Sequence, residues 1–404
     1  GGDGAVSWEK KTLDQLGSIS RGKSKHRPRN DPKLFGGQYP FIQTADVKNA
    51  NFYITEYSDT YNEAGLAQSK LWDVGTLCIT IAANIADTGI LGIPACFPDS
   101  VMGFIPYDGI SDVRFIKYCF DLLQRDCKQI SQGTAQDNLS WQKLSTIEFP
   151  APPIETQHRI ANILSAYDDL IENNRKQIKL LEEAAQRLYK EWFVDLRFPG
   201  HEYTKIVDGV PEGWEFFRFS DKVKIMSGGT PKTDNSNYYG GKIPFYTPKD
   251  SDGAFFAFQT ETNITEEGLD NCNSHLYPEN TIIITARGTV GKTTLLAVPM
   301  AMNQSCYALK SDEINAPYYL FFALNQEIIA LRTMSNGGVF DTIIVKTFDR
   351  IHIRIPSDNL IQRFENMVTS IMELIKAKMK ENFALSEARD RLLPKLMGGE
   401  VEVW

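Results

Sequence analysis

The most regular feature of the chain is a segment, from about residue 154 to 198, in which apolar residues recur in alternating steps of four and three. The seam consists of Ile160, Leu164, Tyr167, Ile171, Asn174, Ile178, Leu181, Ala185, Leu188 and Trp192. All but one of these residues are apolar, and the pattern predicts a long coiled-coil helix. The polar exception, Asn174, is the type of seam residue that fixes register. A helix of about 40 residues spans roughly 60 Å.

A second segment with the same spacing begins near residue 358. Its seam starts with Phe364, Val368, Ile371 and Ile375, and polar residues then interrupt it. Pro394 is expected to end this helix, because proline removes a helix donor and clashes with the preceding turn. Because the chain has to return between the two segments, we expect the two helices to pack antiparallel.

Outside the helices, short β-branched runs such as 77–81 and 281–285 alternate with turn residues and predict mixed α/β structure. The sequence also repeats itself. The segment 35–41 returns as 239–245, an offset of 204, and Trp8-Glu9 returns as Trp214-Glu215 at an offset of 206. The molecule is therefore predicted to be two copies of one unit, with internal two-fold pseudo-symmetry. The predicted domains are 1–153, 154–198 as the first helix, 199–357 with its entry linker, and 358–404 as the second helix and tail.

Composition mainly excludes classes of protein. The 404 residues include 43 Lys plus Arg and 51 Asp plus Glu, giving a net charge of −8. This total argues against a uniformly basic surface, but it does not show where the cations lie. Neither a secretory signal nor an apolar run long enough to span a membrane is visible, so a cytoplasmic location is expected. The six cysteines include no Cys-x-x-Cys pair and the histidines show no ligand spacing, so no metal site is predicted.

The cations are concentrated locally. Residues 21–33 hold six cationic side chains and one acid in a Gly- and Pro-containing loop, typical of a phosphate-contacting loop or of a solvated segment. The corresponding loop of the second copy, residues 228–235, is polar but has little charge. Two similar domains whose loops recognise different targets would show this difference.

The segment 286–293, Ala-Arg-Gly-Thr-Val-Gly-Lys-Thr, satisfies a relaxed P-loop pattern. A phosphate-binding loop has to open a helix, whereas the residues that follow are β-branched and reach Pro299. A Gly-rich turn that exposes Arg287 and Lys292 fits better. A phosphohydrolase centred on Lys292 remains an alternative, as does a non-DNA protein-binding scaffold.

Taken in order, the motifs resemble the specificity (S) subunit of type I restriction–modification systems, and the resemblance covers nearly the whole chain. The motifs that carry it are Ser-Gly-Gly-Thr-Pro at 227–231, Gly-Lys-Ile-Pro-Phe at 241–245, the turn at 285–291, and the passage from 188–200 to 209–215. The first copy departs most, because it lacks the Gly-Thr-Pro run after Gly22.

The resemblance implies an α+β fold in which two similar mixed α/β target-recognition domains are separated by two long antiparallel coiled-coil helices. It implies a non-catalytic subunit whose domains each read one half of a bipartite site in double-stranded DNA. The helices would set the spacing and dock two DNA methyltransferase (modification) subunits, and endonuclease/translocase (restriction) subunits would join them. The implied cofactors, S-adenosylmethionine, ATP and Mg²⁺, and the adenine-N6 methylation and ATP-dependent cleavage, belong to those partners.

Base readout is expected from loop side chains, with Lys and Arg positioning the duplex through phosphates. The candidate DNA-contacting residues are Arg21, Lys23, Lys25, Arg27, Arg29, Thr230, Lys232, Lys249, Arg287 and Lys292.

Overall fold

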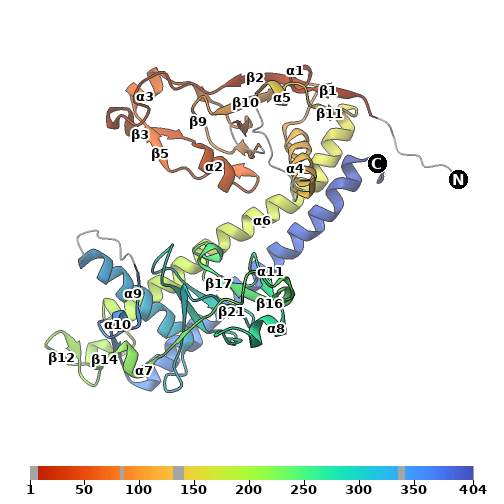
Figure 1. Cartoon of the computed structure of the whole chain (residues 1–404). Coiled ribbons are helices and arrows are strands. Elements are labelled where there is room, and N and C mark those ends of the chain that lie inside the picture. The colour runs from red at the N-terminus through yellow and green to blue at the C-terminus, as the bar shows by residue number, and fades with distance from the viewer. Residues whose placement is uncertain (1–7, 82–85, 131–140, 335–341, 404) are drawn as a thin grey trace. The chain divides into compact units, whose positions relative to one another are not determined.

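The computed structural model describes residues 8–81, 86–130, 141–334 and 342–403 (Figure 1). The chain divides into two compact units. Unit 1 combines the residues up to Arg175 with those from Glu381 onward, and unit 2 comprises Lys176–Lys380. Each unit therefore contains one globular domain together with a segment of each long helix.

Unit 1 begins with a series of short strands. Its strands are β1 (Lys10–Thr12), β2 (Gly17–Arg21), β3 (Phe35–Phe41), β4 (Tyr53–Ile54), β5 (Asp59–Tyr61), β6 (Leu71–Trp72), β7 (Leu77–Thr80), β8 (Thr88–Leu91), β9 (Ala95–Cys96), β10 (Val101–Pro106) and β11 (Glu148–Pro150). Its helices before the long one are α1 (Leu13–Leu16), α2 (Thr44–Asn49), α3 (Glu63–Ala67), α4 (Val113–Ile130) and α5 (Trp141–Leu144).

Unit 2 repeats most of this order and adds the strand pair β12-β13 before it. Its strands are β12 (Ile206–Val207), β13 (Val210–Pro211), β14 (Glu215–Arg218), β15 (Lys224–Ser227), β16 (Tyr239–Tyr246), β17 (Phe256–Ala257), β18 (Asn263–Ile264), β19 (Ile282–Thr285), β20 (Thr293–Leu296), β21 (Ala301–Met302), β22 (Cys306–Lys310) and β23 (His352–Ile355). Its helices apart from the long ones are α7 (Phe219–Lys222), α8 (Glu266–Asp270), α9 (Pro317–Met334) and α10 (Val345–Phe348).

The main sheets of the two units have the same topology. Strand order is β2-β10-β7-β8-β4 in unit 1 and β15-β22-β19-β20-β17 in unit 2. In both, the first four strands pair antiparallel and the last pairs parallel. A smaller sheet beside each is also shared, because β3 pairs antiparallel with β5 and parallel with β9 just as β16 pairs with β18 and β21. The predicted duplication of an α+β unit is confirmed.

The two long helices are α6 (Ile154–Tyr189), which runs on into a π-helical turn (Lys190–Val194), and α11 (Asp358–Met397). Within unit 1 they run antiparallel, because Asp168 of α6 pairs with Arg389 of α11 while the later Asn174 contacts the earlier Asn382. Within unit 2 the ring of Tyr189 lies against that of Phe364 near the start of α11.

The seam residues of α6 and α11 differ in how far they are buried. The buried ones are Ile160, Leu164, Ile171, Asn174, Ala185, Trp192, Phe364, Val368 and Ile375. Tyr167, Ile178, Leu181, Leu188 and Ile371 are partly buried. Asp168, Tyr189 and Met372, each one residue beyond a predicted seam position, are buried as well.

The expectation that Pro394 ends the second helix is wrong, because α11 continues through it to Met397. Proline cannot donate to the carbonyl of Asp390 four residues earlier. The Arg125 guanidinium, from α4, donates to that carbonyl instead and so supplies the missing partner. The helix ends at a glycine pair, where Gly399 has a φ of 69° and the Gly398 amide donates to the Pro394 carbonyl.

Candidate nucleic-acid interface

In both units the candidate residues of the sequence lie at one end of the main sheet. In unit 1 the last residue of β2, Arg21, is paired with Met102 near the start of β10, and Thr80 at the end of β7 is paired with Val101. The segments 21–31 and 97–100 therefore share this end. In unit 2 the pairs Ser227↔Tyr307, Thr285↔Cys306 and Ile284↔Thr293 place the segments 228–232, 286–292 and 303–305 at the matching end. We call these segments, with 247–251, the loop face of each unit.

The basic loop of unit 1 begins at Gly22, where its backbone passes close to the backbone of Pro98. A Cβ on Gly22 would lie 2.3 Å from the Pro98 carbonyl oxygen, so only glycine fits there. The loop backbone is then held by the end of α3: the Gln68 side-chain oxygen accepts from the amides of Lys25 and His26 at 2.6 and 3.0 Å. These contacts fix the loop while the side chains of Lys23 and Lys25 stay exposed.

The cations of this loop fall into two groups. Arg29 binds the Asp99 carboxylate at 2.7 Å and Arg27 lies 3.9 Å from it, so Asp99 holds two of the arginines. Arg21, Lys23 and Lys25 are exposed and have no ion pair within the described part of the chain. An amide of Lys33 and the His26 ring, 2.9 Å away, hold the pKa of Asp31 below its usual value. The loop therefore presents free lysines beside arginines that are already oriented by a carboxylate.

In unit 2 the backbone at Gly228 passes equally close to the backbone of Asn303, but the side chains that follow differ from those of unit 1. A Cβ on Gly228 would lie 2.3 Å from the Asn303 carbonyl oxygen, just as Gly22 approaches Pro98. The following Thr230 donates its hydroxyl hydrogen to the Gln304 side-chain oxygen. Because Gly228 matches Gly22 and Asn303 matches Pro98, Gln304 occupies the position that Asp99 has in unit 1. The sequence reading missed both Gln304 and Asp99, whose equivalence could have been found by extending the repeat to residues 98 and 303.

The P-loop-like segment is a turn between two strands. It joins β19 to β20, which pair antiparallel, so no helix N-terminus follows Lys292 and the phosphohydrolase alternative has no structural support. Gly288 and Gly291 both have a φ of 76°, which favours glycine. The Lys292 ammonium donates to the Ser251 carbonyl at 3.1 Å, and the Thr289 hydroxyl donates to that of Pro248 at 3.3 Å. These bonds bring the turn against segment 247–251. Arg287 and Lys292 are both exposed, as expected of a Gly-rich turn.

The loop face of unit 2 also carries exposed cations besides Lys292. Arg287 and Lys249 are exposed on the two segments that the Lys292 bond joins, and Lys232 is exposed on the loop after β15. All ten sequence candidates thus lie on the loop face of their own unit.

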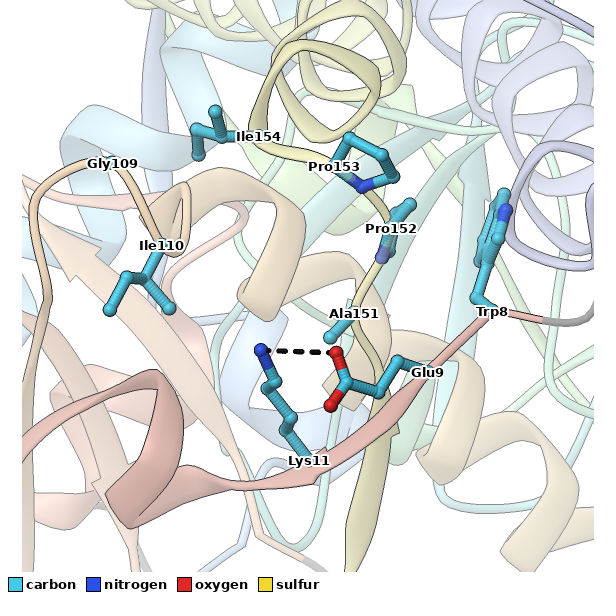
Figure 2. Close-up of a pocket in the computed structure, with 9 residues that line it drawn as sticks. All are labelled: Trp8, Glu9, Lys11, Gly109, Ile110, Ala151, Pro152, Pro153 and Ile154. Atoms are coloured by element: carbon cyan, nitrogen blue, oxygen red, sulfur yellow. Dashed lines mark ion pairs between the residues drawn. The ribbon is translucent and has the colours of Figure 1, made fainter.

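The opposite end of the unit 1 sheet carries a hollow of about 460 Å³ (Figure 2). Its lining combines Trp8, Ile110 and the prolines before α6 with the charged side chains of Glu9 and Lys11. Figure 2 shows the Lys11 ammonium and the Glu9 carboxylate turned towards each other, 3.2 Å apart, so the charges there offset each other. This end is remote from the basic loop, since Pro106 of β10 pairs with Gly17 at the start of β2.

The described residues contain neither a metal-binding cluster nor a membrane-spanning helix. No group of three or more His, Cys, Asp or Glu side chains there is arranged to hold a metal ion. None of the helices in that part is long and apolar enough to cross a membrane.

Comparison with known proteins places the chain in a family. The model of the type I restriction modification DNA specificity domain matches residues 5–183 and again 211–380. The chain therefore belongs to this family and contains two such domains.

Similar proteins span its whole length. The MjaIX specificity subunit of Methanocaldococcus jannaschii is 27% identical over 98% of this chain and 94% of its own. The HindI specificity subunit of Haemophilus influenzae is 27% identical over 96% of this chain and 98% of its own length. The crystal structure of the type I restriction–modification S subunit from M. genitalium covers 98% of this chain and 97% of its own, with a TM-score of 0.57 and 18% identity, which supports the fold.

Proposed function

We propose that this chain is the DNA-recognition subunit of a type I restriction–modification assembly, in which each unit reads one half of a bipartite site. The observation that carries the proposal is the loop face, because two sheets of identical topology present exposed cations at the same end. Cations at this end suit phosphate contacts, which position a duplex, and the different loop sequences suit two different half-sites. Family membership favours this function over a non-DNA scaffold.

Two side chains on the loop faces are suited to reading bases. The Gln304 amide, which Thr230 holds, has the donor and acceptor that pair with an adenine edge. The Arg29 guanidinium, which Asp99 orients, has the donors that suit guanine. We assign the remaining candidates, Arg21, Lys23, Lys25, Arg27, Lys232, Lys249, Arg287 and Lys292, to phosphate contacts or to support of these loops.

The long helices are proposed to dock two modification subunits. Large apolar side chains are exposed at the same two places in each unit: Ile163 and Leu170 on α6, and Met367 and Leu374 on α11, at an offset of 204. Each pair is seven residues apart and so lies on one side of its helix. Two equivalent apolar stripes fit two copies of one partner.

The experiment is to co-express the chain with its modification subunit and to map methylated adenines across a genome. A two-part motif that disappears without this chain is expected, and its absence would contradict the proposal. Leu170→Lys and Leu374→Lys should each lower the number of bound modification subunits from two to one. Full occupancy in both variants would rule out the stripes as docking sites.

A further inference from the structure

An ion pair lies inside the helix pair of unit 1. The Asp168 side chain is fully buried and accepts from the Arg389 guanidinium and, at 2.6 Å, from the Tyr118 hydroxyl of α4. Arg389 also donates to Asp390 at 2.8 Å. The pair thus joins α6 to α11 at a position where a coiled coil normally carries apolar residues.

The repeat places apolar residues at the same position of unit 2. The offset of 204 carries Asp168 onto Met372 and Ala185 onto Arg389. Met372 and Ala185 are both fully buried and belong to the one apolar core of unit 2. A single site of the duplicated helix pair is therefore ionic in one unit and apolar in the other.

This difference matters because the repeat makes α6 and α11 similar to each other. In the same antiparallel alignment, α6 of one chain has the geometry to pair with α6 of a second chain, and α11 with α11. Such like-with-like pairing would place Asp168 opposite Ala185, and Arg389 opposite Met372. Each charge would then face an apolar residue in place of its counter-ion across the helix pair, and the fully buried Asp168 would keep only the Tyr118 hydroxyl, which is strongly unfavourable.

We propose that the Asp168–Arg389 pair makes the helix pairing selective: it directs α6 to α11 of its own chain and rejects a second copy of either helix. A buried polar contact that excludes the wrong partner is the best-attested role of such groups in coiled coils. Asn174 adds to the selection, because it donates to the Asn382 side-chain oxygen at 3.0 Å, whereas like-with-like pairing would place it opposite Ile178.

The selection can be tested on the full-length chain without DNA or partner subunits. Two differently tagged copies are unfolded together in guanidinium and refolded over a range of concentrations. Capture of one tag then measures co-purification of the other, and light scattering measures mass. The central variant combines Asp168→Met and Arg389→Ala with Tyr118→Phe, because the buried Tyr118 hydroxyl would otherwise lose its acceptor. At the offset of 204 these are the residues of unit 2, where Phe322 corresponds to Tyr118. The matched control is the reversed pair, Asp168→Arg with Arg389→Asp, which keeps the selection.

We expect the wild type and the reversed pair to refold as single chains without exchange. The apolar variant should melt within about 3 °C of the wild type yet co-capture the second chain increasingly with concentration. Each single change should instead lower the melting temperature by roughly 6 °C or more, because the remaining charge loses its counter-ion across the helix pair. The proposal is overturned if the apolar variant refolds as single chains at every concentration, or if the wild type exchanges equally.

Discussion

The two units build the same sheet on the same helix pair but attach it differently. In unit 1 the contact between α4 and the long helices includes the polar network of Tyr118, Asp168 and Arg389. In unit 2 the corresponding helix, α9, packs mainly through aromatic rings: Tyr189 lies against Tyr319 and Phe322 at centroid distances of 5.9 Å. Polar contacts remain there as well: Glu365 accepts from the Tyr318 and Tyr319 amides at the start of α9, and Glu373 accepts from the Tyr318 hydroxyl at 3.1 Å.

The difference shows that this architecture does not require a particular kind of contact between domain and helices. An apolar interface contributes free energy wherever its shape is complementary, whereas a buried ion pair contributes little net stability but penalises every arrangement that separates its partners. The helix pair of unit 2 is therefore apolar at the site of Met372 and Ala185, where the helix pair of unit 1 holds the ion pair that discriminates between arrangements.

The largest loss of stability is expected from placing a charge at the apolar site of unit 2, which Met372 and Ala185 form. Met372→Asp leaves a carboxylate buried opposite Ala185 and should lower the free energy of unfolding by about 3–5 kcal/mol. Chemical denaturation with a domain-resolved probe measures this loss. Met372→Leu, which keeps volume and polarity, is the control and should cost under about 1.5 kcal/mol.

Adding Ala185→Arg to Met372→Asp tests whether the site in unit 2 can hold the ion pair of unit 1. If the site in unit 2 is geometrically equivalent to that in unit 1, the arginine should recover part of the loss. A double variant that is less stable than Met372→Asp would show that the two sites are not interchangeable.

The long helices could be predicted from the sequence because their apolar spacing is local and regular. The same reasoning missed Asp168, because a charged residue is normally assigned to the exposed face. Asp168 and Arg389 are 221 residues apart. Their pairing depends on the antiparallel alignment of α6 and α11, which a single seam does not specify. The prediction that Pro394 ends the helix is wrong for a similar reason, because the Arg125 side chain that replaces its missing donor lies on another helix.

The loop faces were predictable only in part. Local charge density marks Arg21, Lys23 and Lys25, and all three are exposed on the loop face. The sequence cannot show that Arg29 is held by a carboxylate 70 residues away, or that Gln304 lies beside Thr230. Both contacts arise where strand pairing brings remote loops together at one end of a sheet.

The contribution of Glu365 to the stability of unit 2 is expected to depend on pH. Burial raises the pKa of this carboxyl to about 7, although the Tyr318 and Tyr319 amides oppose the rise. Because the folded state binds the proton more tightly than the unfolded state, this stabilisation is complete below about pH 4.5 and is lost as the pH rises to about 7. The loss amounts to at most about 3 kcal/mol.

Glu365→Gln removes this titration. Melting curves between pH 4.5 and 8 should show the variant gaining stability relative to the wild type as the pH rises. A constant difference across that range would contradict the raised pKa. The fully apolar substitution Met372→Leu should leave the pH dependence unchanged.

The base-reading assignment predicts a change confined to one half-site. Gln304→Ala should remove about 1–3 kcal/mol of discrimination at a single adenine position of the half-site read by unit 2, because the bidentate amide contact is lost. Methylation mapping of the assembled complex would show that position relaxed and the other half-site unchanged. Gln362→Ala, an exposed amide on α11, is the control. Equal relaxation by both variants, or none by Gln304→Ala, would exclude this role.

The smallest effect expected is on the salt dependence of DNA binding, and it tests whether both loop faces contact phosphates. In the assembled complex, Lys23→Ala in unit 1 and Lys232→Ala in unit 2 should each lower the slope of log affinity against log salt by about 0.9, the value for one phosphate contact. Lys11→Ala is the matched control, because Lys11 lies at the other end of the unit 1 sheet beside Glu9. A loop face that faces DNA in only one unit would change the slope for one lysine alone. If Lys11→Ala changed the slope as much as the other two, the charge of the whole unit and not its loop face would control binding.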